Sequence, residues 1–506
     1  MRTEIETKIN IEALPLLRAI RALLGERSLQ AYLVGGYVRD SILSHPTRDI
    51  DVAVRGPVEE LGRRLADSLG GSLVILGKED RVARVVLPQE DGAGTPWQVD
   101  LVSITSDIAE NLGQRDFTID ALAVDLDDVD PEGYVGEVID PFGGLKDLQD
   151  RLIRAVGLEV FRKDPARLMR AIRLAAKLDF SIYPDTQSLM GRDAQLLAQV
   201  APERIRTDLC SILATDHGYQ ALRLMEGLGL LQVLVPELEE GRGVGQPKEH
   251  HWDVYDHCLE TVQALEQLLS DKADEKDEFI ASLTWARDYS DHFGDEHPGA
   301  SPRRTLVKLA SLLHDVGKPS TKTVESSGRI RFYGHSQVGA DMAGRIMRRL
   351  RFSTRETKHV QTIVLHHLRP GLMSTPGELP TAKAIYRYFR DTGEAAIDTV
   401  FVNLADYRAA RGPMLGWEEW HRYAECCRHI LSTGLAREEH TPPKPLVNGH
   451  DLMRELQLPP GPLIGTLLDE VREARTAGEI ETREEALELA ERSLGLRKAN
   501  PAERAP

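Results

Sequence analysis

The chain has 506 residues, of which 41% are hydrophobic, 28% are charged and only 5% are aromatic, and its formal net charge is −17. This length corresponds to about three domains of ordinary size, which excludes a single compact core. No segment reaches the roughly 18 consecutive apolar residues of a membrane helix, and residues 1–10 are charged, unlike a signal peptide. We therefore expect a cytoplasmic protein without membrane contacts.

Four cysteines in so long a chain predict neither a disulfide framework nor a zinc site, because no pair has the spacing of zinc ligands. The negative total charge argues against a general nucleic-acid coat, so that a polyanionic partner must meet a local basic patch. No oligomeric state follows from the composition.

The apolar pattern changes character near residue 155. Before this point, short apolar or alternating runs separated by Gly, Pro and Asp turns predict strands. These runs are 32–34, 50–54, 72–76, 81–87, 98–102 and 121–126, with helical periodicity at 11–24 and 58–69. The pattern predicts the α+β class, with an α/β head that precedes a helical body.

From residue 158 onward nearly every segment has helical periodicity. The predicted helices are 165–178, 202–215, 219–227, 257–269, 305–314, 336–350 and 382–390. Residues 270–304 have the composition of a solvated insertion, and the proline-containing stretch 437–447 predicts a linker. A last helical module is expected at 449–496.

The head contains a glycine pair that is suited to phosphate binding. Gly35 and Gly36 follow a β-like run, and Arg39 and Asp40 lie at the start of the next helix. The backbone N–H groups of such a turn and the positive end of a helix can meet a phosphate.

An Asp-x-Asp pair follows about ten residues later. Because side chains alternate along a strand, Asp49 and Asp51 face one side while Ile50 and Val52 face the core. Two carboxylates so close repel one another unless cations lie between them, and two Mg²⁺ ions with a nucleoside triphosphate are the expected partners. The alternative for an isolated pair is a solvated strand end.

The glycine turn and the Asp-x-Asp strand together resemble the class II tRNA nucleotidyltransferase and bacterial poly(A) polymerase family. The resemblance extends to about residue 230 through four further motifs, at 115–122, 139–148, 161–173 and 203–205. It implies a polymerase-beta-like head that uses Mg²⁺, with ATP and CTP as substrates and the tRNA 3′ end as the partner.

The resemblance also implies roles for single residues. Asp49 and Asp51 would hold the metal ions, and Asp100 would be a third catalytic carboxylate, unless it is an ordinary surface residue. Arg115 with Asp116 would orient the sugar and triphosphate, and the pair Asp164 and Arg167 would select the base; an ion pair is the alternative in both cases. The implied nucleotide-binding residues are Gly35, Gly36, Arg39, Arg115, Asp116, Asp164, Arg167, Arg170 and Arg173.

The sequence departs from the family pattern at three points. Lys163 precedes Asp164 where an acidic residue is usual, Gln114 replaces an arginine, and Asp120 replaces an asparagine. In addition, only about 15 residues separate Asp100 from Arg115, whereas members that build the whole CCA end usually carry a longer flexible loop there. Addition of CC alone or of A alone is therefore a possible outcome beside the full triplet.

A second set of chemical side chains is spread over the predicted helices of the body. Imidazole and carboxylate ligands from several helices suit a divalent metal that activates water. Residues 250–412 resemble the HD phosphohydrolase superfamily, which implies Mg²⁺, Mn²⁺ or Ni²⁺ as the metal. The implied ligands are His257, His314, Asp315 and Asp406, with His335, His366 and Lys318 as further metal or phosphate contacts. His367 and His421 are interpreted as ordinary polar residues.

These features predict a nucleotidyltransferase head at 1–155, a helical nucleotide-selecting and RNA-binding neck at 156–245, an HD domain at 250–412 and a helical tRNA-binding module at 445–500. The basic run 344–359 is either a solvated helix face or an RNA contact. The expected activity is transfer of CMP, AMP or both to the tRNA 3′ end with release of pyrophosphate. The alternatives are a poly(A) polymerase, an HD phosphohydrolase with a nucleotide-sensing head, and a non-catalytic RNA-binding protein.

Overall fold

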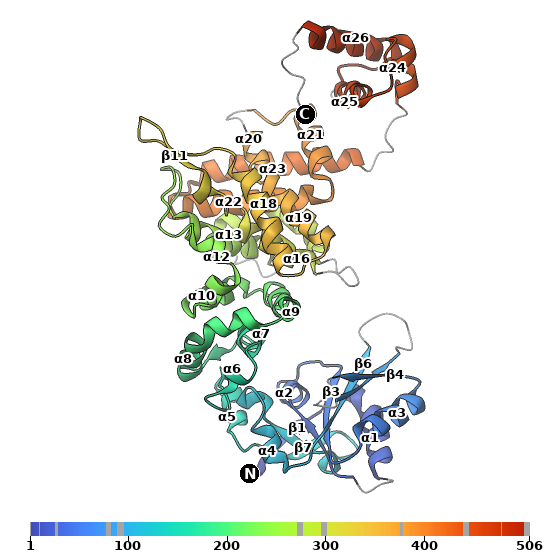
Figure 1. Ribbon diagram of the computed structural model, residues 1–506, viewed down its shortest axis with the longest axis vertical. Coiled ribbons are helices and arrows are strands. Elements are labelled where there is room, and N and C mark those ends of the chain that lie inside the picture. The colour runs from blue at the N-terminus through green and yellow to red at the C-terminus, as the bar shows by residue number, and fades with distance from the viewer. Residues whose placement is uncertain are drawn as a thin grey trace. The chain divides into compact units, whose positions relative to one another are not determined.

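The computed structural model describes residues 2–9, 11–25, 29–76, 82–88, 96–270, 277–294, 301–374, 378–438, 445–476 and 478–499. The chain forms two compact units (Figure 1). The first comprises Met1–Asp208 and Leu224–Leu234, and the second comprises Leu209–Arg223 and Val235–Pro506. Among the helices of the described residues, none combines the length and apolar character needed to cross a bilayer.

The first unit contains an eight-stranded mixed sheet. The strand order is β1-β8-β7-β2-β3-β6-β5-β4, in which only β3 and β6 pair in parallel. The strands are β1 (Arg2–Lys8), β2 (Ala31–Val34), β3 (Asp49–Val54), β4 (Ser72–Leu76), β5 (Val82–Leu87), β6 (Trp97–Ser103), β7 (Ala123–Asp125) and β8 (Tyr134–Ile139). All six predicted strands are present, and β1 and β8 were not predicted.

Helices surround this sheet and continue into the neck. Helix α3 packs on β4, β5 and β6 through Leu61 and Leu65, which are buried, and α2 directly follows β2. A two-stranded parallel sheet joins β9 (Leu152–Ile153) to β10 (Ser181–Ile182). The helices are α1 (Leu14–Gly25), α2 (Gly36–Ile42), α3 (Val58–Leu69), α4 (Ile108–Leu112), α5 (Gly144–Gln149), α6 (Val160–Lys163), α7 (Arg167–Leu178), α8 (Pro184–Asp193), α9 (Pro202–Leu213), which continues into the second unit, and α11 (Leu230–Leu234).

In the residues that the structure describes, the second unit is helical apart from one short hairpin. Helix α13 packs between α16 and α22, and α18 packs along α19. The helices of this part are α10 (Gly218–Gly227), which ends in the first unit, α12 (Pro236–Glu239), α13 (Val254–Leu269), α14 (Glu278–Ala281), α15 (Ser290–Gly294), α16 (Arg303–Leu313), α17 (Lys318–Thr321), α18 (His335–Arg349), α19 (Thr354–His366), α20 (Arg369–Leu372), α21 (Ala382–Thr392), α22 (Ala396–Arg411) and α23 (Trp417–Glu438). The hairpin consists of β11 (Lys322–Val324) and β12 (Ile330–Phe332).

The predicted solvated insertion at 270–304 is partly wrong. Its described part contains α14, a 3-10 helix at Thr284–Tyr289 and α15, and it buries Ile280, Leu283 and Phe293. The Phe293 ring packs edge-on against Phe401 of α22 at 4.7 Å between centroids. The composition of the segment did not indicate these helices, because its apolar residues are few and widely spaced.

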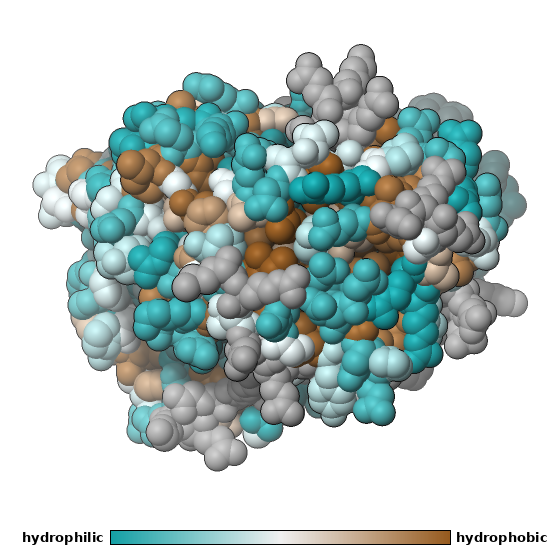
Figure 2. Space-filling model, turned by 90° about the horizontal axis from the view of Figure 1, so that it is seen from below, coloured by the Kyte–Doolittle hydropathy of each residue, from teal (hydrophilic) through white to brown (hydrophobic). Residues whose placement is uncertain are grey.

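The C-terminal module is a small helical bundle, as expected. Helices α24 (Gly449–Glu455), α25 (Pro462–Thr476) and α26 (Arg483–Ala499) share one apolar core. Most of the predicted linker, residues 439–444, lies outside the described residues. Figure 2 shows one face of the molecule, on which hydrophilic side chains (teal) surround smaller hydrophobic areas (brown).

Candidate active site

The predicted acidic residues lie side by side on two neighbouring strands of the head sheet. In the parallel pair of β3 and β6, Asp51 is in register with Asp100, and Asp49 is in register with Gln98. Ile50 and Val52 are buried, so the expected alternation along β3 is confirmed. Burial raises the pKa of Asp51 and outweighs the opposing charge of Arg115; with the added effect of nearby Asp100, the pKa is about 6.

Asp100 has a partner that the sequence did not suggest. Arg84 of β5 stands opposite Asp100 on the neighbouring strand and donates to both of its carboxylate oxygens, at 2.8 and 2.7 Å. By contrast, no donor among the described residues reaches the carboxylates of Asp49 or Asp51 in a hydrogen bond or ion pair. Of the three acidic residues of the head, Asp49 and Asp51, which were predicted to bind metal, therefore have no direct contact that compensates their charge.

The glycine turn approaches this acidic pair closely. Gly35 has a φ of 69°, and a Cβ at this position would lie 2.8 Å from Nη1 of Arg115 and 3.0 Å from Oδ2 of Asp51. Glycine is therefore required both by the backbone and by the space. Gly36 begins α2, so the turn, Asp51 and Arg115 meet at one place, as the motifs predict.

Arg39 is placed differently from the prediction of a triphosphate contact. Its side chain is only 8% exposed, and its guanidinium donates to Asp120 at 2.5 Å and to Asp40 at 2.8 Å. Arg170 of α7 also contacts Asp120, at 3.3 Å. Burial of Asp120 opposes its ionisation, but the two arginines outweigh this effect and hold its pKa below the ordinary value. Arg39 thus joins the head to α7 through Asp120.

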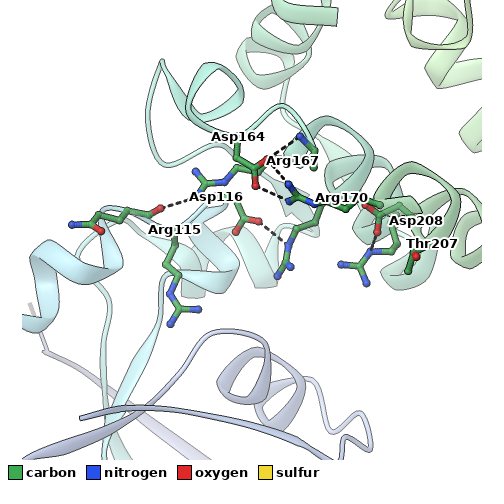
Figure 3. Close-up of a pocket in the computed structure, with 11 residues that line it drawn as sticks. Arg115, Asp116, Asp164, Arg167, Arg170, Thr207 and Asp208 are labelled. Atoms are coloured by element: carbon green, nitrogen blue, oxygen red, sulfur yellow. Dashed lines mark hydrogen bonds and ion pairs between the residues drawn. The ribbon is translucent and has the colours of Figure 1, made fainter. Parts of the chain in front are cut away.

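A polar pocket of about 440 Å³ lies in the same unit (Figure 3). Five arginines and three aspartates line it, so its wall is positively charged. In Figure 3 the Arg115 side chain points away from the other arginines and toward the ribbon of the N-terminal strands, consistent with its approach to Gly35. The lining residues are Gln114, Arg115, Asp116, Asp164, Ala166, Arg167, Arg170, Arg173, Arg204, Thr207 and Asp208.

The expected helix start near Pro165, which would place Asp164 and Arg167 on one helix face, is wrong, although both residues line the pocket. Helix α7 begins at Arg167 instead of near Pro165, so Asp164 has an extended backbone and does not share a helix face with Arg167. Asp164 accepts two hydrogen bonds from Arg204 of α9, at 3.1 and 2.8 Å, and Arg167 donates to the carbonyl of Gln114. Arg204 was visible in the 203–205 motif but was given no role there.

Arg170 and Arg173 of the pocket are also held by carboxylates. Arg170 lies 2.7 Å from Asp116, and Arg173 lies 2.9 Å from Asp208 of α9. These ion pairs fix the guanidinium groups along one wall, where their remaining N–H donors suit phosphate or a base edge.

A second cluster lies in the helical unit, around the predicted His314-Asp315 pair. Nε2 of His257 is 3.1 Å from Nε2 of His314 and 3.0 Å from Oδ1 of Asp406, and Nε2 of His314 is 3.1 Å from Oδ2 of Asp315. Burial opposes the protonation of His314, but Asp315 and Asp406 outweigh it and raise its pKa. Facing imidazole nitrogens beside two carboxylates form a ligand set for a divalent cation.

The contacts of the second carboxylate oxygen of Asp315 differ from the prediction, which gave His366 and not His367 a role in the cluster. Its Oδ1 faces His335 at 3.4 Å and His367 at 3.7 Å, and these three buried atoms have no hydrogen-bond partner among the described residues. His367, interpreted as an ordinary polar residue, is therefore in the cluster, whereas His366 lies outside the ligand groups. Lys318 donates to Oδ2 of Asp315 at 2.5 Å and to Gln246 at 2.6 Å.

Four family models match the chain. They are the poly A polymerase head domain at residues 31–154, "Probable RNA and SrmB- binding site of polymerase A" at 179–241, the HD domain at 254–411 and the putative tRNA nucleotidyltransferase domain 2 at 440–490. An A-adding tRNA nucleotidyltransferase of Deinococcus radiodurans is 32% identical over 91% of this chain and 95% of its own length. The chain belongs to the tRNA nucleotidyltransferase family.

Other members of this family match over similar lengths. A CC-adding tRNA nucleotidyltransferase of Thermus thermophilus is 31% identical over 90% of this chain and 92% of its own length. A structure of the Thermotoga maritima CCA-adding enzyme complexed with tRNA has a TM-score of 0.61 at 21% identity and covers 96% of this chain and 97% of its own. A CCA-adding enzyme with CTP has a TM-score of 0.64 at 21% identity, covering 96% of both chains. The last two similarities concern the fold.

Proposed function

We propose that the head of this tRNA nucleotidyltransferase transfers a nucleoside monophosphate from CTP or ATP to the 3′-hydroxyl of tRNA. The observation that carries the proposal is the meeting of Asp49, Asp51 and Asp100 on the neighbouring strands β3 and β6, beside the Gly35 turn and Arg115. Arg115 also lines the arginine-rich pocket, which connects these carboxylates to a site of suitable size and charge for a triphosphate.

The residues present fit a magnesium site. Asp51 lies next to another carboxylate, its pKa is raised to about 6, and no donor among the described residues reaches it, so a bound cation would stabilise its ionised form. Asp49 and Asp51 would hold the ions. Bound Mg²⁺ lowers the pKa of an attacking hydroxyl and stabilises the charge of the leaving pyrophosphate.

The chain's own side chains orient the reactants. The 3′-oxygen attacks the α-phosphorus, the bond from that phosphorus to the bridging oxygen breaks, and pyrophosphate leaves. Arg115 and the backbone of the Gly35 turn bind the triphosphate, and Arg170, fixed by Asp116, lines the sugar side. Asp164 and Arg167 offer an acceptor and a donor fork to the base, with Arg204 setting the orientation of Asp164.

We further propose that this enzyme adds only part of the CCA triplet. The segment between β6 and Arg115 is short, and its helix α4 is anchored by Ile108 and Leu112, which are buried in the head core with Ile104. No long flexible loop is present between residues 104 and 114 to re-form the site for a second kind of base.

Labelled triphosphates test these proposals directly. Purified protein is incubated with tRNA that lacks its CCA end, or ends in CC, together with CTP, ATP or both. Asp49→Ala with Asp51→Ala should abolish incorporation and leave tRNA binding unchanged. Incorporation by that variant would refute the metal-site assignment, addition of all three nucleotides by the wild type would refute partial addition, and a long A tail on unrelated RNA would favour the poly(A) polymerase alternative.

The histidine–aspartate cluster supports a second activity, a metal-dependent phosphohydrolase. The supporting observation is the convergence of unpaired buried ligand atoms from His335, His367 and Asp315. Mg²⁺, Mn²⁺ and Ni²⁺ are the candidate ions. Phosphate release from a phosphomonoester, or opening of a 2′,3′-cyclic phosphate by water to a 2′- or 3′-phosphomonoester, should require one of them and should disappear in His314→Ala, which should retain nucleotide transfer. Hydrolysis that survives in His314→Ala would exclude this site.

A further inference from the structure

The hairpin of β11 and β12 stands beside the histidine–aspartate cluster and has no role in the activities above. It projects from the helical unit in Figure 1. Its two strands pair only with each other, from Lys322 opposite Phe332 to Val324 opposite Ile330. A two-stranded hairpin contributes little to a core, so its side chains are available for another role.

Both ends of the hairpin are rooted in the cluster. Lys318, which contacts Asp315, precedes β11, and its Nζ lies 5.5 Å from the centre of the Phe332 ring. After β12, Nδ1 of His335 lies 2.7 Å from the carbonyl oxygen of Phe332. Phe332 therefore fixes the base of the hairpin between two residues that face Asp315.

Tyr333 is the outstanding exposed side chain of this hairpin. It is 69% exposed, and Val324 on the opposite strand is 62% exposed. Tyr333 is two residues from His335, so that the two Cα atoms are at most about 7 Å apart. An aromatic ring held in water this close to a ligand cluster presents a flat face that an aromatic ligand can cover.

The ring and the surrounding charges are organised. The Tyr333 hydroxyl donates to Oε1 of Glu325 at 3.2 Å, and Nε of Arg331 lies 3.3 Å from the same oxygen. Lys322 and Arg329 are exposed on the hairpin as well, so residues 322–332 carry three basic side chains and one acidic side chain. The ring is thus restrained in an environment that favours an anion.

We propose that this hairpin is a nucleobase-binding arm of the histidine–aspartate centre, in which Tyr333 stacks on the base of a nucleotide whose phosphate lies at the cluster. The ligand is either a mononucleotide or the terminal nucleotide of an RNA, with Lys322 and Arg329 directed to further phosphates. The proposal rests on the phosphohydrolase function proposed above.

Base recognition and hydrolysis can be measured separately with two phosphomonoesters of secondary alcohols, adenosine 2′-phosphate, which carries a base, and glycerol 2-phosphate, which does not. With the metal-loaded full-length protein, Tyr333→Ala should raise the KM for adenosine 2′-phosphate by about tenfold, the effect of losing one base–aromatic stack, and leave the KM for glycerol 2-phosphate unchanged. Tyr333→Phe should behave as the wild type because it keeps the ring. Met414→Ala, which removes another exposed side chain of the same unit, is the control. An unchanged KM for adenosine 2′-phosphate in Tyr333→Ala would overturn the proposal.

Photo-cross-linking supplies a readout that does not depend on hydrolysis. A short RNA with 5-iodouridine at its 3′ end should cross-link to Tyr333, as mapped by peptide mass spectrometry, and a 5-iodouridine mononucleotide should do so if the free nucleotide also binds. A cross-link at Tyr333 without hydrolysis of either ester would refute the phosphohydrolase and support the arm. Hydrolysis of both esters with cross-links only elsewhere would refute the arm and retain the phosphohydrolase.

Discussion

Asp120 shows how one residue connects the head to the neck. The family pattern has an asparagine at this position, whereas here a buried carboxylate contacts Arg39 from α2 and Arg170 from α7. An asparagine could accept one of these hydrogen bonds but would supply no negative charge, which would leave Arg39 with Asp40 alone and Arg170 with Asp116 alone. The charge of Asp120 therefore compensates the buried Arg39 guanidinium. Through Arg170, Asp120 also holds α7 next to the nucleotide pocket.

Arg84 is a second residue whose role follows from its contacts. It forms a two-point hydrogen bond with Asp100, and this bond, with the charges of Asp49 and Asp51, raises the pKa of its guanidinium above the ordinary value. Since Asp100 adjoins Asp51 in the register of β3 and β6, Arg84 compensates one of three neighbouring carboxylates. It limits the negative charge that is available to a metal ion.

We predict that Arg84→Ala increases the affinity of the head for Mg²⁺. Removal of a half-exposed unit charge beside the site is worth about 1 kcal/mol, which corresponds to roughly a fivefold lower Mg²⁺ dissociation constant. The metal-free variant should unfold at a lower temperature than the wild type, and Mg²⁺ should raise its unfolding temperature by more. Thermal unfolding at a series of Mg²⁺ concentrations measures both effects.

Arg84→Lys is the matched variant for this prediction, because it keeps the charge and loses the two-point hydrogen bond. Its Mg²⁺ affinity should stay close to that of the wild type. If Arg84→Ala and the wild type gain the same stability from Mg²⁺, Arg84 does not act on the metal site through charge.

The residue scale also marks the limit of prediction from sequence. Asp49, Asp51 and Gly35 follow from strand alternation and turn chemistry, which are local. The contact between Asp100 and Arg84 does not follow from local pattern, because it depends on β5 lying next to β6 in the sheet. His366 and His367 are neighbours at the end of α19, and the end of the helix decides which of them faces Asp315.

At the scale of elements, six of the eight strands of the head were predictable from alternation, whereas the ion pairs along the pocket wall were not. The expected Asp164 and Arg167 pair assumed that a helix begins near Pro165, whereas α7 begins two residues later and Asp164 pairs with α9. The strand β1 was missed because its alternating residues are mostly charged or polar. The start of a helix, the partner of a side chain and the pairing of a polar strand depend on which element packs against them. A single sequence does not show this.

Four elements of the helical unit meet at one buried carboxylate, Asp398 of α22. Nε2 of His292 lies 2.8 Å from one of its oxygens, and Nε2 of His359 and Nη1 of Arg303 lie 2.7 and 2.8 Å from the other. Burial would raise the pKa of Asp398, but the two histidines and Arg303 outweigh it and hold the pKa well below the ordinary value. This cluster ties α15, α16 and α19 to α22.

Asp398 should therefore make the helical unit sensitive to acid. Its pKa is lower in the folded state than in the unfolded state, where it is about 3.9, so its stabilisation is complete above that pH and is lost as the pH falls below it. Asp398→Asn should lower the free energy of unfolding at pH 7 by about 2–4 kcal/mol and flatten its decline below pH 4. Guanidinium unfolding at several pH values measures both effects.

Glu394 provides the control for this prediction, since it is an exposed carboxylate that pairs with Arg355. Exposed ion pairs contribute little, so Glu394→Gln should leave the stability and its pH dependence nearly unchanged. An equally steep loss of stability below pH 4 in Asp398→Asn would mean that other carboxylates control the acid response.

At the scale of the whole molecule, each compact unit has its own candidate centre. The acidic residues of β3 and β6 and the arginine pocket belong to the first unit, and the histidine–aspartate cluster belongs to the second. The net charge of −17 is spread over the chain, so binding of a polyanion depends on local basic surfaces. One such surface is the predicted basic run 344–359, where Arg345 and Arg348 of α18 are exposed.

We predict that tRNA binding is strongly salt-dependent and that α18 contributes to it. If three phosphates are contacted, the affinity should fall about 20- to 40-fold between 50 and 200 mM salt. Arg345→Ala with Arg348→Ala should make the dependence of log Kd on log salt shallower by about 1.5, whereas Arg355→Ala should change it little because Arg355 already pairs with Glu394. Filter binding at a series of salt concentrations gives these slopes. An unaltered slope in the double variant would mean that the basic run is a solvated helix face, and the arginines of the head pocket would then account for the salt dependence.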